Sequence, residues 1–143
     1  MECAKENCLF CKIVRKEIPA EIIYEDEIIL SFLDIDPINH GHLLIIPKMH
    51  FLDLDELDEE TAVHIMKFSI KATIAFKKIF KPEGYSIMQN GGYFNDIGHY
   101  HMHIFPRYKS DGFGWTYNER DTENISLKDI RNSICRELIG KVE

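Results

Sequence analysis

Residues 99–107 read His-Tyr-His-Met-His-Ile-Phe-Pro-Arg, with three histidines at every second position. In a β-strand, residues two apart point to the same face of the sheet, about 6.6 Å from each other. The alternation therefore predicts a strand over 100–106 which, together with His99 just before it, carries three imidazoles on one face and buries Tyr100, Met102 and Ile104 on the other. A solvated strand face has no reason to repeat one residue type three times, so the pattern indicates a chemical site.

The rest of the chain predicts an α+β fold with a mainly antiparallel sheet. Apolar residues recur at three- and four-residue steps over about 58–80, which predicts one long helix that ends before Pro82. A second helix is expected over about 127–139, where Ser126 and Asp129 form a variant of the capping box. Several predicted strands follow one another without intervening helices. The expected strands are 21–24, 28–34, 42–47, 85–89 and 100–106, preceded by a short helix around 9–16.

Length and composition are those of an ordinary globular protein. The 143 residues, 45% of them hydrophobic and 29% charged, predict one domain over 1–143. Its motif-bearing core spans about 8–107 and a C-terminal helical extension spans about 108–143. The net charge of −7 disfavours binding to long nucleic acids, because such binding depends on Lys and Arg. The longest aliphatic run, Leu43 to Ile46, is far too short for a membrane span, and Met1 to Lys12 does not resemble a secretory signal. We therefore expect a cytoplasmic protein.

Cys8 and Cys11 form a Cys-x-x-Cys pair, which has three interpretations in a compartment that keeps thiols reduced. The pair can be two buried thiols, a redox motif, or half of a zinc site. A redox motif would need a following βαβ unit, which the strand-rich stretch up to Pro47 does not supply. Zinc needs four nitrogen or sulfur ligands, and His50 and His99 are candidates for the other two positions.

Two blocks of sequence together resemble the histidine triad (HIT) family, whose motif alternates three histidines with apolar residues. The first block is Gly-His-Leu-Leu-Ile-Ile-Pro-Lys-Met-His over 41–50, and the second is the segment 99–107. Phe32-Leu-Asp-Ile35 is similar to the segment that surrounds the nucleotide in the Hint-like, nucleotide-binding branch. The resemblance extends from Cys8 to about Arg107. It implies a HIT-like fold of about five antiparallel strands, one long central helix and a C-terminal helix.

The resemblance also implies roles for the histidines. His101, the middle histidine, is the expected nucleophile that attacks the α-phosphorus and forms a nucleotidyl-imidazole, which water then hydrolyses. His103 is expected to hydrogen-bond the phosphate or the leaving group, and an imidazole with a pKa near 6.5 suits proton donation. In zinc-containing members the first triad histidine joins a Cys-x-x-Cys pair and the histidine of the Pro-Lys-x-His block. The resemblance thus implies one structural zinc per chain, held by Cys8, Cys11, His50 and His99.

The expected nucleotide contacts follow from the same resemblance. Asp34, which lies between Phe32 and Ile35 in the sequence, is expected to accept hydrogen bonds from the ribose hydroxyls. Asn90 is preferred to its neighbour Gln89 as the amide that contacts the substrate. Most relatives carry Gly-Gln-x before the triad, where this chain has Phe94-Asn95-Asp96. Asn95 takes the Gln position. Asp96 stands where the nucleotide-binding branch has serine, and we expect it to face outward or to orient a neighbour, because a carboxylate repels phosphate. The full set of expected nucleotide contacts is Phe32, Asp34, Ile35, Asn90, Asn95, His101 and His103.

The leading functional hypothesis is a zinc-containing hydrolase of nucleoside phosphoramidates or dinucleoside polyphosphates. Its expected partner is a purine nucleotide or nucleotide conjugate, and nucleotidyl transfer to a second substrate is possible within the same chemistry. A non-catalytic nucleotide-binding or sensing module is the second hypothesis, and a redox or metal-delivery protein is the third. Because dimeric relatives close the site with C-terminal residues, we expect a homodimer. Trp115 then either enters the partner's pocket or covers its own chain.

Overall fold

The computed structural model describes residues 5–117 and 126–139 of the chain. The chain divides into two compact units, Met1–Phe113 and Gly114–Glu143. The first unit contains the sheet, the Cys-x-x-Cys pair and the segments 32–35, 41–50 and 99–107, and the second contains the C-terminal helix. The interpretation of 1–143 as one domain therefore stays a prediction, and each unit is described by itself.

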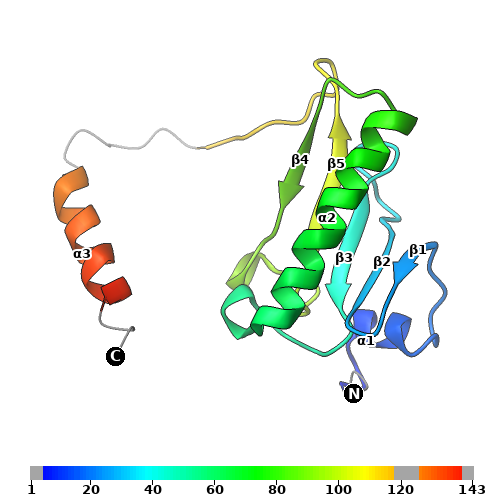
Figure 1. Ribbon diagram of the computed structural model, residues 1–143, viewed down its shortest axis with the longest axis horizontal. Coiled ribbons are helices and arrows are strands. Elements are labelled where there is room, and N and C mark those ends of the chain that lie inside the picture. Colours follow the sequence, from blue (N-terminus) through cyan, green and yellow to red (C-terminus); the bar gives the residue numbers. More distant parts are fainter. Residues whose placement is uncertain (1–4, 118–125, 140–143) are drawn as a thin grey trace. The chain divides into compact units, whose positions relative to one another are not determined.

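The first unit is an antiparallel five-stranded sheet with helices, as the sequence predicts (Figure 1). The strands lie in the order β1-β2-β3-β5-β4, and each neighbouring pair is antiparallel. In this order β5 pairs on both sides, with Leu44 of β3 and Met88 of β4 both opposite His103. The triad strand is thus held inside the sheet, away from its edges. The elements are α1 (Leu9–Val14), β1 (Ile22–Glu25), β2 (Ile29–Leu33), β3 (Leu43–Pro47), η1 (Leu54–Glu56), α2 (Glu59–Ile79), β4 (Gly84–Met88), η2 (Gly92–Phe94) and β5 (Met102–Arg107).

Helix α2 begins and ends where its sequence directs. The carboxylate of Asp58 accepts a hydrogen bond from the backbone N–H of Thr61 at 2.7 Å, which caps the first turn. Glu59 and Glu60 in the first turn and Lys77 and Lys78 in the last turn complement the helix dipole. The acidic run 53–60, which holds six of the chain's 24 acidic residues, thus ends in the cap and first turn of this helix.

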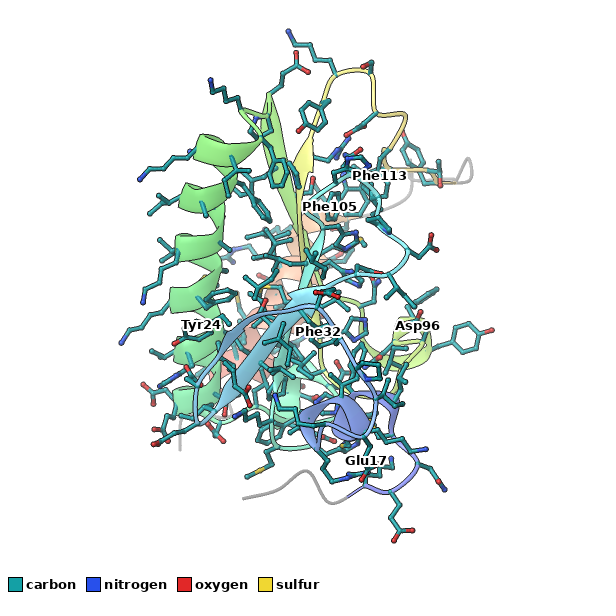
Figure 2. All side chains as sticks on the ribbon, turned by 90° about the vertical axis from the view of Figure 1, so that its right-hand side faces the viewer. Glu17, Tyr24, Phe32, Asp96, Phe105 and Phe113 are labelled. Carbon is teal, nitrogen blue, oxygen red and sulfur yellow. The ribbon has the colours of Figure 1, made fainter. Side chains whose placement is uncertain are left out.

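The two faces of the sheet carry different layers. Figure 2 shows α2 along one side of the sheet, with Phe32 and Asp96 on the other side. On the α2 side, Tyr100, Met102 and Ile104 pack with Ile65, Ala72 and Phe76 of the helix in one buried cluster. A second cluster on the opposite face joins α1 to β2 and β3, and its members are Cys8, Phe10, Cys11, Ile13, Leu30, Phe32, Leu44 and Ile46.

The predicted alternation of the triad segment is confirmed, although β5 begins only at Met102. The apolar residues Tyr100, Met102 and Ile104 enter the α2-side core, and the histidines face the α1 side. Much of this histidine face is covered, because the ring of Phe10 packs edge-on against His101 at a centroid distance of 5.3 Å. His99 is 0% and His101 2% exposed.

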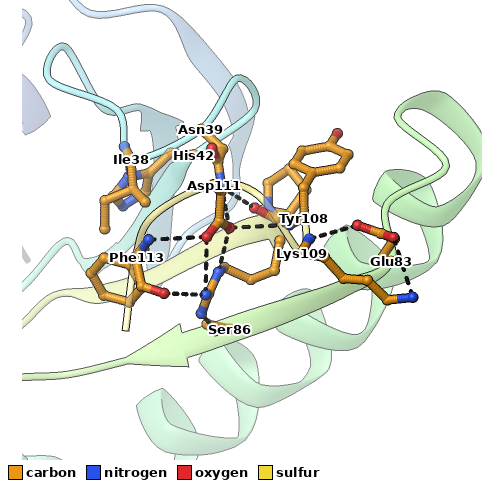
Figure 3. A network of polar contacts seen from close by, with 11 residues as sticks. Ile38, Asn39, His42, Glu83, Ser86, Tyr108, Lys109, Asp111 and Phe113 are labelled. Carbon is orange, nitrogen blue, oxygen red and sulfur yellow. Dashed lines mark hydrogen bonds and ion pairs between the residues drawn. The ribbon is translucent and has the colours of Figure 1, made fainter. Parts of the chain in front are cut away.

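A polar network fixes the end of β5 to the loop that precedes β3 (Figure 3). Arg107 Nε donates to Asp111 Oδ2 at 2.6 Å, and Asn39 Nδ2 donates to the same oxygen at 3.0 Å. The backbone N–H groups of Tyr108 and Phe113 also donate to this carboxylate, each at 3.0 Å. The hydrogen bonds, that from Arg107 first, hold the pKa of Asp111 well below its usual range. The network thereby holds the loop that carries His42 close to the triad strand.

The C-terminal unit contains α3 (Leu127–Ile139), within the predicted bounds. Ser126 Oγ accepts a hydrogen bond from the backbone N–H of Asp129 at 3.3 Å, as the capping-box variant predicts. Its apolar stripe of Leu127, Ile130, Ile134 and Leu138 is exposed. Within residues 5–117 and 126–139, no helix is long and apolar enough to cross a membrane.

Gly41, in the loop before β3, lies against the ring of Phe80 at the end of α2, and a substitution there tests this close approach. Its φ of +91° lies in the left-handed region, and a Cβ atom there would lie 2.5 Å from Cε2 of the Phe80 ring. We expect Gly41→Ala to lower the free energy of unfolding by about 1 to 3 kcal/mol, measured by urea denaturation.

Gly84→Ala is the matched control. A Cβ at Gly84 would meet nothing within 4 Å, and its φ is not in the left-handed region. The control should be neutral or slightly more stable, by up to about 1 kcal/mol. Equal losses in the two variants would contradict the proposed clash with Phe80.

Candidate active site

Four side chains predicted as zinc ligands lie together on the α1 side of the sheet. One donor atom from each of Cys8, Cys11, His50 and His99 lies within 4.8 Å of all the others. His99 Nδ1 is 3.4 Å from Cys8 Sγ and 3.7 Å from Cys11 Sγ, and His50 Nδ1 is 3.4 Å from Cys11 Sγ. In a tetrahedral zinc site, bond lengths of about 2.3 Å to sulfur and 2.0 to 2.1 Å to nitrogen separate neighbouring ligands by about 3.5 Å. The donor set therefore fits zinc in both chemistry and spacing.

His99 has its metal-facing nitrogen fixed by the backbone. Its Nε2 lies 2.9 Å from the carbonyl oxygen of Pro47, so the neutral ring carries its proton there and donates it. The lone pair of Nδ1 is then directed toward the two sulfurs. Burial lowers the pKa of His99 to about 4, which keeps the imidazole neutral at neutral pH, as a metal ligand requires.

The two cysteines differ in state. Cys8 is a free thiol, whereas Cys11 is disulfide-bonded in the structure. The sequence-based expectation of reduced cysteines is therefore not met at Cys11. A disulfide sulfur is not a thiolate ligand, so these four residues fit zinc only in the reduced protein.

His101 lies with its two ring nitrogens in different environments. Nδ1 is 2.8 Å from the carbonyl oxygen of His99, an acceptor, so in the neutral ring Nδ1 carries the proton. Nε2 then keeps its lone pair. His101 also lines a pocket on this face of the sheet, next to Asp96. The geometry thus gives a buried imidazole with a nucleophilic nitrogen at a pocket wall.

His103 is held in the opposite tautomer by His42. The backbone N–H of Ile38 donates to His42 Nδ1 at 3.0 Å, so the proton of neutral His42 is on Nε2. Nε2 lies 2.9 Å from His103 Nδ1 and donates to it, which leaves the His103 proton on Nε2. His42 therefore orients His103 through a hydrogen bond.

Burial, followed by the neighbouring imidazoles of His101 and His42, lowers the pKa of His103 to about 4. Burial also lowers the pKa of His42. The expectation of an unperturbed His103 imidazole is therefore wrong. At neutral pH this side chain is an uncharged N–H donor.

Asp34, His42 and His103 form a second cluster of donor atoms, with Asp34 Oδ2 3.5 Å from His42 Nε2 and 3.8 Å from His103 Nδ1. A metal here would need the lone pair of His42 Nε2. His42 Nδ1 already accepts a hydrogen bond from the backbone N–H of Ile38, so it carries no proton. If Nε2 also gave its lone pair to a metal, the ring would have lost both protons and would be an imidazolate, which is costly to form. The cluster is therefore better suited to orienting His103 than to binding a metal.

A pocket of about 240 Å³ lies over the histidine face between α1, β2 and the segment before β5. Its lining includes five of the predicted site residues: Phe32, Asp34, Ile35, His101 and His103. Ile35 is 99% exposed at the rim, whereas Phe32 is 4% exposed at the wall. Within this one cavity His101 and His103 meet a largely apolar wall.

Asn90 and Asn95 do not line this pocket. The Asn95 amide donates to the carbonyl oxygen of Leu52 at 2.9 Å and accepts from the backbone N–H of Gly98 at 3.0 Å. It thus holds the segment before the triad in place. The backbone carbonyl of Asn90 accepts from the Gln89 side chain at 2.9 Å. Direct substrate contacts by the two asparagines stay predictions.

Sequence reasoning missed most of the apolar wall. Leu9, Phe10 and Ile13 of α1 line the pocket, as do Ile18, Pro19, Ala20 and Ile97. In the sequence these residues are indistinguishable from ordinary core residues, because no periodic signal says which apolar side chains border a cavity. Leu9 and Phe10 differ from the others in lying between the two cysteines of the Cys-x-x-Cys motif.

Comparison with known proteins agrees with this geometry. Residues 15–110 match the HIT domain model. "Protein hit" of Bacillus subtilis is 41% identical, with 96% of this chain and 98% of that protein covered. Adenosine 5'-monophosphoramidase hnt1 of Schizosaccharomyces pombe is 38% identical over 76% of this chain and 83% of its own length.

Among solved structures, a zinc-bound histidine triad family protein from Mycobacterium smegmatis is similar, with a TM-score of 0.71 and 34% identity. The similarity covers 82% of this chain and 86% of that protein. The domain match spans more than half of the chain, and the relatives align over most of their own lengths. The chain therefore belongs to the HIT family.

Proposed function

We propose that this protein hydrolyses a nucleotide conjugate, a nucleoside phosphoramidate or a dinucleoside polyphosphate, through a covalent nucleotidyl-His101 intermediate. The observation that carries the proposal is the environment of His101. Its Nδ1 proton is held by the His99 carbonyl oxygen at 2.8 Å, and its other nitrogen is left at the wall of a pocket. The similarity to a relative named adenosine 5'-monophosphoramidase supports the same class of reaction.

For a phosphoramidate, the reaction has two displacements at phosphorus. His101 Nε2 forms a bond to the α-phosphorus while the bond from phosphorus to the amine nitrogen breaks. The amine leaves with that electron pair and one proton from pocket water. Water then attacks phosphorus, the bond to Nε2 breaks with its electron pair returning to the ring, and one proton is released. The products are the free amine and the nucleoside monophosphate.

Other residues of the pocket position the substrate in this proposal. His103, neutral and protonated on Nε2, donates a hydrogen bond to a phosphate oxygen or to the leaving group. The Asp34 side chain, which is 17% exposed and lies beside His103, accepts hydrogen bonds from the ribose hydroxyls. The apolar wall with Phe32 and Ile35 suits a purine base. Nucleotidyl transfer to a second substrate would use the same first displacement.

Replacing His101 by Asn tests the nucleophile. We expect turnover to fall by roughly 10³-fold or more, because the attacking nitrogen is lost, while the circular dichroism spectrum is unchanged. Stopped reactions of the wild-type protein should contain a nucleotidyl adduct on His101, detected by mass spectrometry. His40→Asn is the control, since His40 is exposed and does not line the pocket.

Retained turnover in His101→Asn would refute the covalent mechanism. Two results together would favour the competing hypothesis of a nucleotide-binding module. Calorimetry would show micromolar nucleotide affinity, and the wild-type protein would hydrolyse neither phosphoramidates nor dinucleoside polyphosphates.

We further propose that the reduced protein holds one structural zinc ion at Cys8, Cys11, His50 and His99. Bound zinc would supply a fixed cross-link between α1 and the triad segment, and four protein ligands would leave no open coordination position for catalysis. The similar zinc-bound protein from Mycobacterium smegmatis supports the proposal.

Elemental analysis of protein purified in a reducing buffer without added metal should find about one zinc per chain. Chelation should lower the thermal midpoint, because structural zinc contributes on the order of 10 kcal/mol of apparent binding free energy. Cys8→Ser should lose the metal, and Cys135→Ser, which changes a free thiol on α3, should keep it. Metal-free reduced protein with a midpoint indifferent to chelators would contradict the site.

A homodimer is also proposed, with two copies meeting at β4. This strand is an edge of the sheet, and it exposes Tyr85 and Ile87 at 47% and 44%. Lys77 of α2 lies 5.9 Å from the Tyr85 ring, which places that side of the helix next to β4. The exposed Ile70 and Ile74 fall on the same side by helical spacing. A second copy would cover both the unpaired edge and the apolar helix face.

Light scattering at micromolar concentration should give twice the mass of one chain. Ile74→Glu should give monomers, because it places a charge in the apolar contact. Ile79→Glu, at an exposed apolar position near the end of α2 that borders a groove beside β1 and β2, should remain dimeric. A monomeric wild-type protein would overturn the proposed contact.

Three further expectations stay predictions. They are the entry of Trp115, which is 93% exposed, into a partner's pocket, the cytoplasmic location, and the lack of binding to long nucleic acids.

A further inference from the structure

The pocket that would receive a phosphate has an unusual charge balance. None of the residues that the structure describes as lining it is Lys or Arg, whereas Asp34 and Asp96 are both carboxylates. Asp34 is turned inward, 3.5 Å from His42 and 3.8 Å from His103. Burial keeps His42 and His103 uncharged at neutral pH. The fixed charge that faces a bound substrate is therefore negative.

Asp96 is the carboxylate placed to act on the reacting end of the substrate. Its Oδ1 lies 3.7 Å from His101 Nε2, the atom proposed to attack phosphorus. The Asp96 side chain is 83% exposed, and within residues 5–117 and 126–139 no Lys or Arg forms an ion pair with it. Figure 2 shows Asp96 projecting from the side of the sheet opposite α2, where Phe32 also lies. Its charge is thus uncompensated by a neighbouring cation and directed to the pocket mouth.

A carboxylate here repels every nucleotide phosphate to the same extent, so this repulsion cancels when two conjugates of one nucleotide are compared. What differs is the leaving group. An in-line displacement puts the leaving nitrogen about 5 Å beyond the attacking nitrogen, and hence about 6 Å from the carboxylate for a right-angled approach. The additional charge lies one or two carbons further along the amine, and rotation about the single bonds of that chain brings it to a similar distance from the carboxylate. For a unit charge on the leaving group about 6 Å from the carboxylate, Coulomb's law predicts a change in rate of about 3-fold at the dielectric constant of water. At half that dielectric constant the change is about 10-fold.

The segment that carries Asp96 also presents two aromatic rings. Tyr93 and Phe94 are 96% and 75% exposed, and their rings lie edge to face at 5.6 Å. Exposed aromatic faces attract organic cations through their quadrupoles. A carboxylate and two rings on one short segment therefore favour the same kind of group, an alkylammonium.

We propose that Asp96 is a specificity-determining residue that selects nucleotide phosphoramidates whose leaving amine carries an additional positive charge. It disfavours conjugates with an anionic leaving group, and a second nucleotide of a dinucleoside polyphosphate is one of these. The inference rests on the proposed hydrolysis at His101 and names the substrate class of that same site. It uses the two displacements given above and adds no step to them.

Three phosphoramidates of adenosine monophosphate with nearly equal size test the proposal. Their leaving amines are ethylenediamine, propylamine and glycine, which carry an additional positive, zero or negative charge. Each is measured with the wild-type protein and with Asp96→Asn, which removes the charge and keeps the shape. The ratio of kcat/KM between variant and wild type for one substrate cancels the intrinsic reactivity of its amine. Asp55→Asn, at an exposed carboxylate that does not line the pocket, is the control.

Asp96→Asn should lower kcat/KM about 3- to 10-fold for the ethylenediamine conjugate and raise it by a similar factor for the glycine conjugate. The propylamine conjugate should change less than twofold, and Asp55→Asn should change none of the three. The effects should shrink between 0.05 and 0.5 M salt, because exposed charges are screened.

Changes by one common factor for all three substrates would overturn the proposal, since they would show that Asp96 only orients His101 or the loop. If the wild-type protein hydrolyses none of the three and forms no His101 adduct, the proposed function itself fails, and the specificity of Asp96 fails with it.

Discussion

Each triad imidazole has one nitrogen committed to a partner inside the protein, and this constraint assigns the role of the other nitrogen. His99 donates to the Pro47 carbonyl oxygen at 2.9 Å, and His101 lies 2.8 Å from the His99 carbonyl oxygen. His103 accepts from His42 at 2.9 Å. One alternating segment therefore supplies a metal-facing lone pair, a nucleophilic lone pair and an N–H donor from three chemically identical side chains.

The fold provides these partners because β5 pairs on both sides and α1 covers its histidine face. Pairing with β3 and β4 fixes the backbone, so the carbonyl of His99 and the loop of His42 stay at hydrogen-bond distance. Phe10 packs edge-on against His101 and helps to reduce its exposure to 2%. The resulting burial lowers the pKa of both His99 and His103 to about 4, which keeps one available as a ligand and the other as a neutral donor. Packing and chemistry are thus set by the same contacts.

The sequence was most informative where a short pattern has a single geometric meaning. The alternation of His99, His101 and His103 predicted a strand face, and the paired cysteines with two histidines predicted the donor cluster. The tautomers could not be predicted, because they depend on carbonyl oxygens and on His42, which are brought together only by the sheet. The same holds for the apolar wall from α1, since Phe10 and Ile13 carry no sequence feature that separates a pocket wall from a core. Nor could the sequence place Asp96 beside His101, or show that Asn95 uses both ends of its amide within the chain.

Nucleophilic attack by His101 depends on which ring nitrogens of the triad carry protons, and nitrogen NMR measures this directly. Long-range proton–nitrogen correlation spectra of histidine-labelled protein at pH 8, where an unperturbed histidine is neutral, report which ring nitrogen carries the proton. The structure predicts the proton of His101 on Nδ1 and that of His103 on Nε2. A His101 proton on Nε2 would contradict the account, because the nitrogen at the pocket would then have no lone pair with which to attack phosphorus.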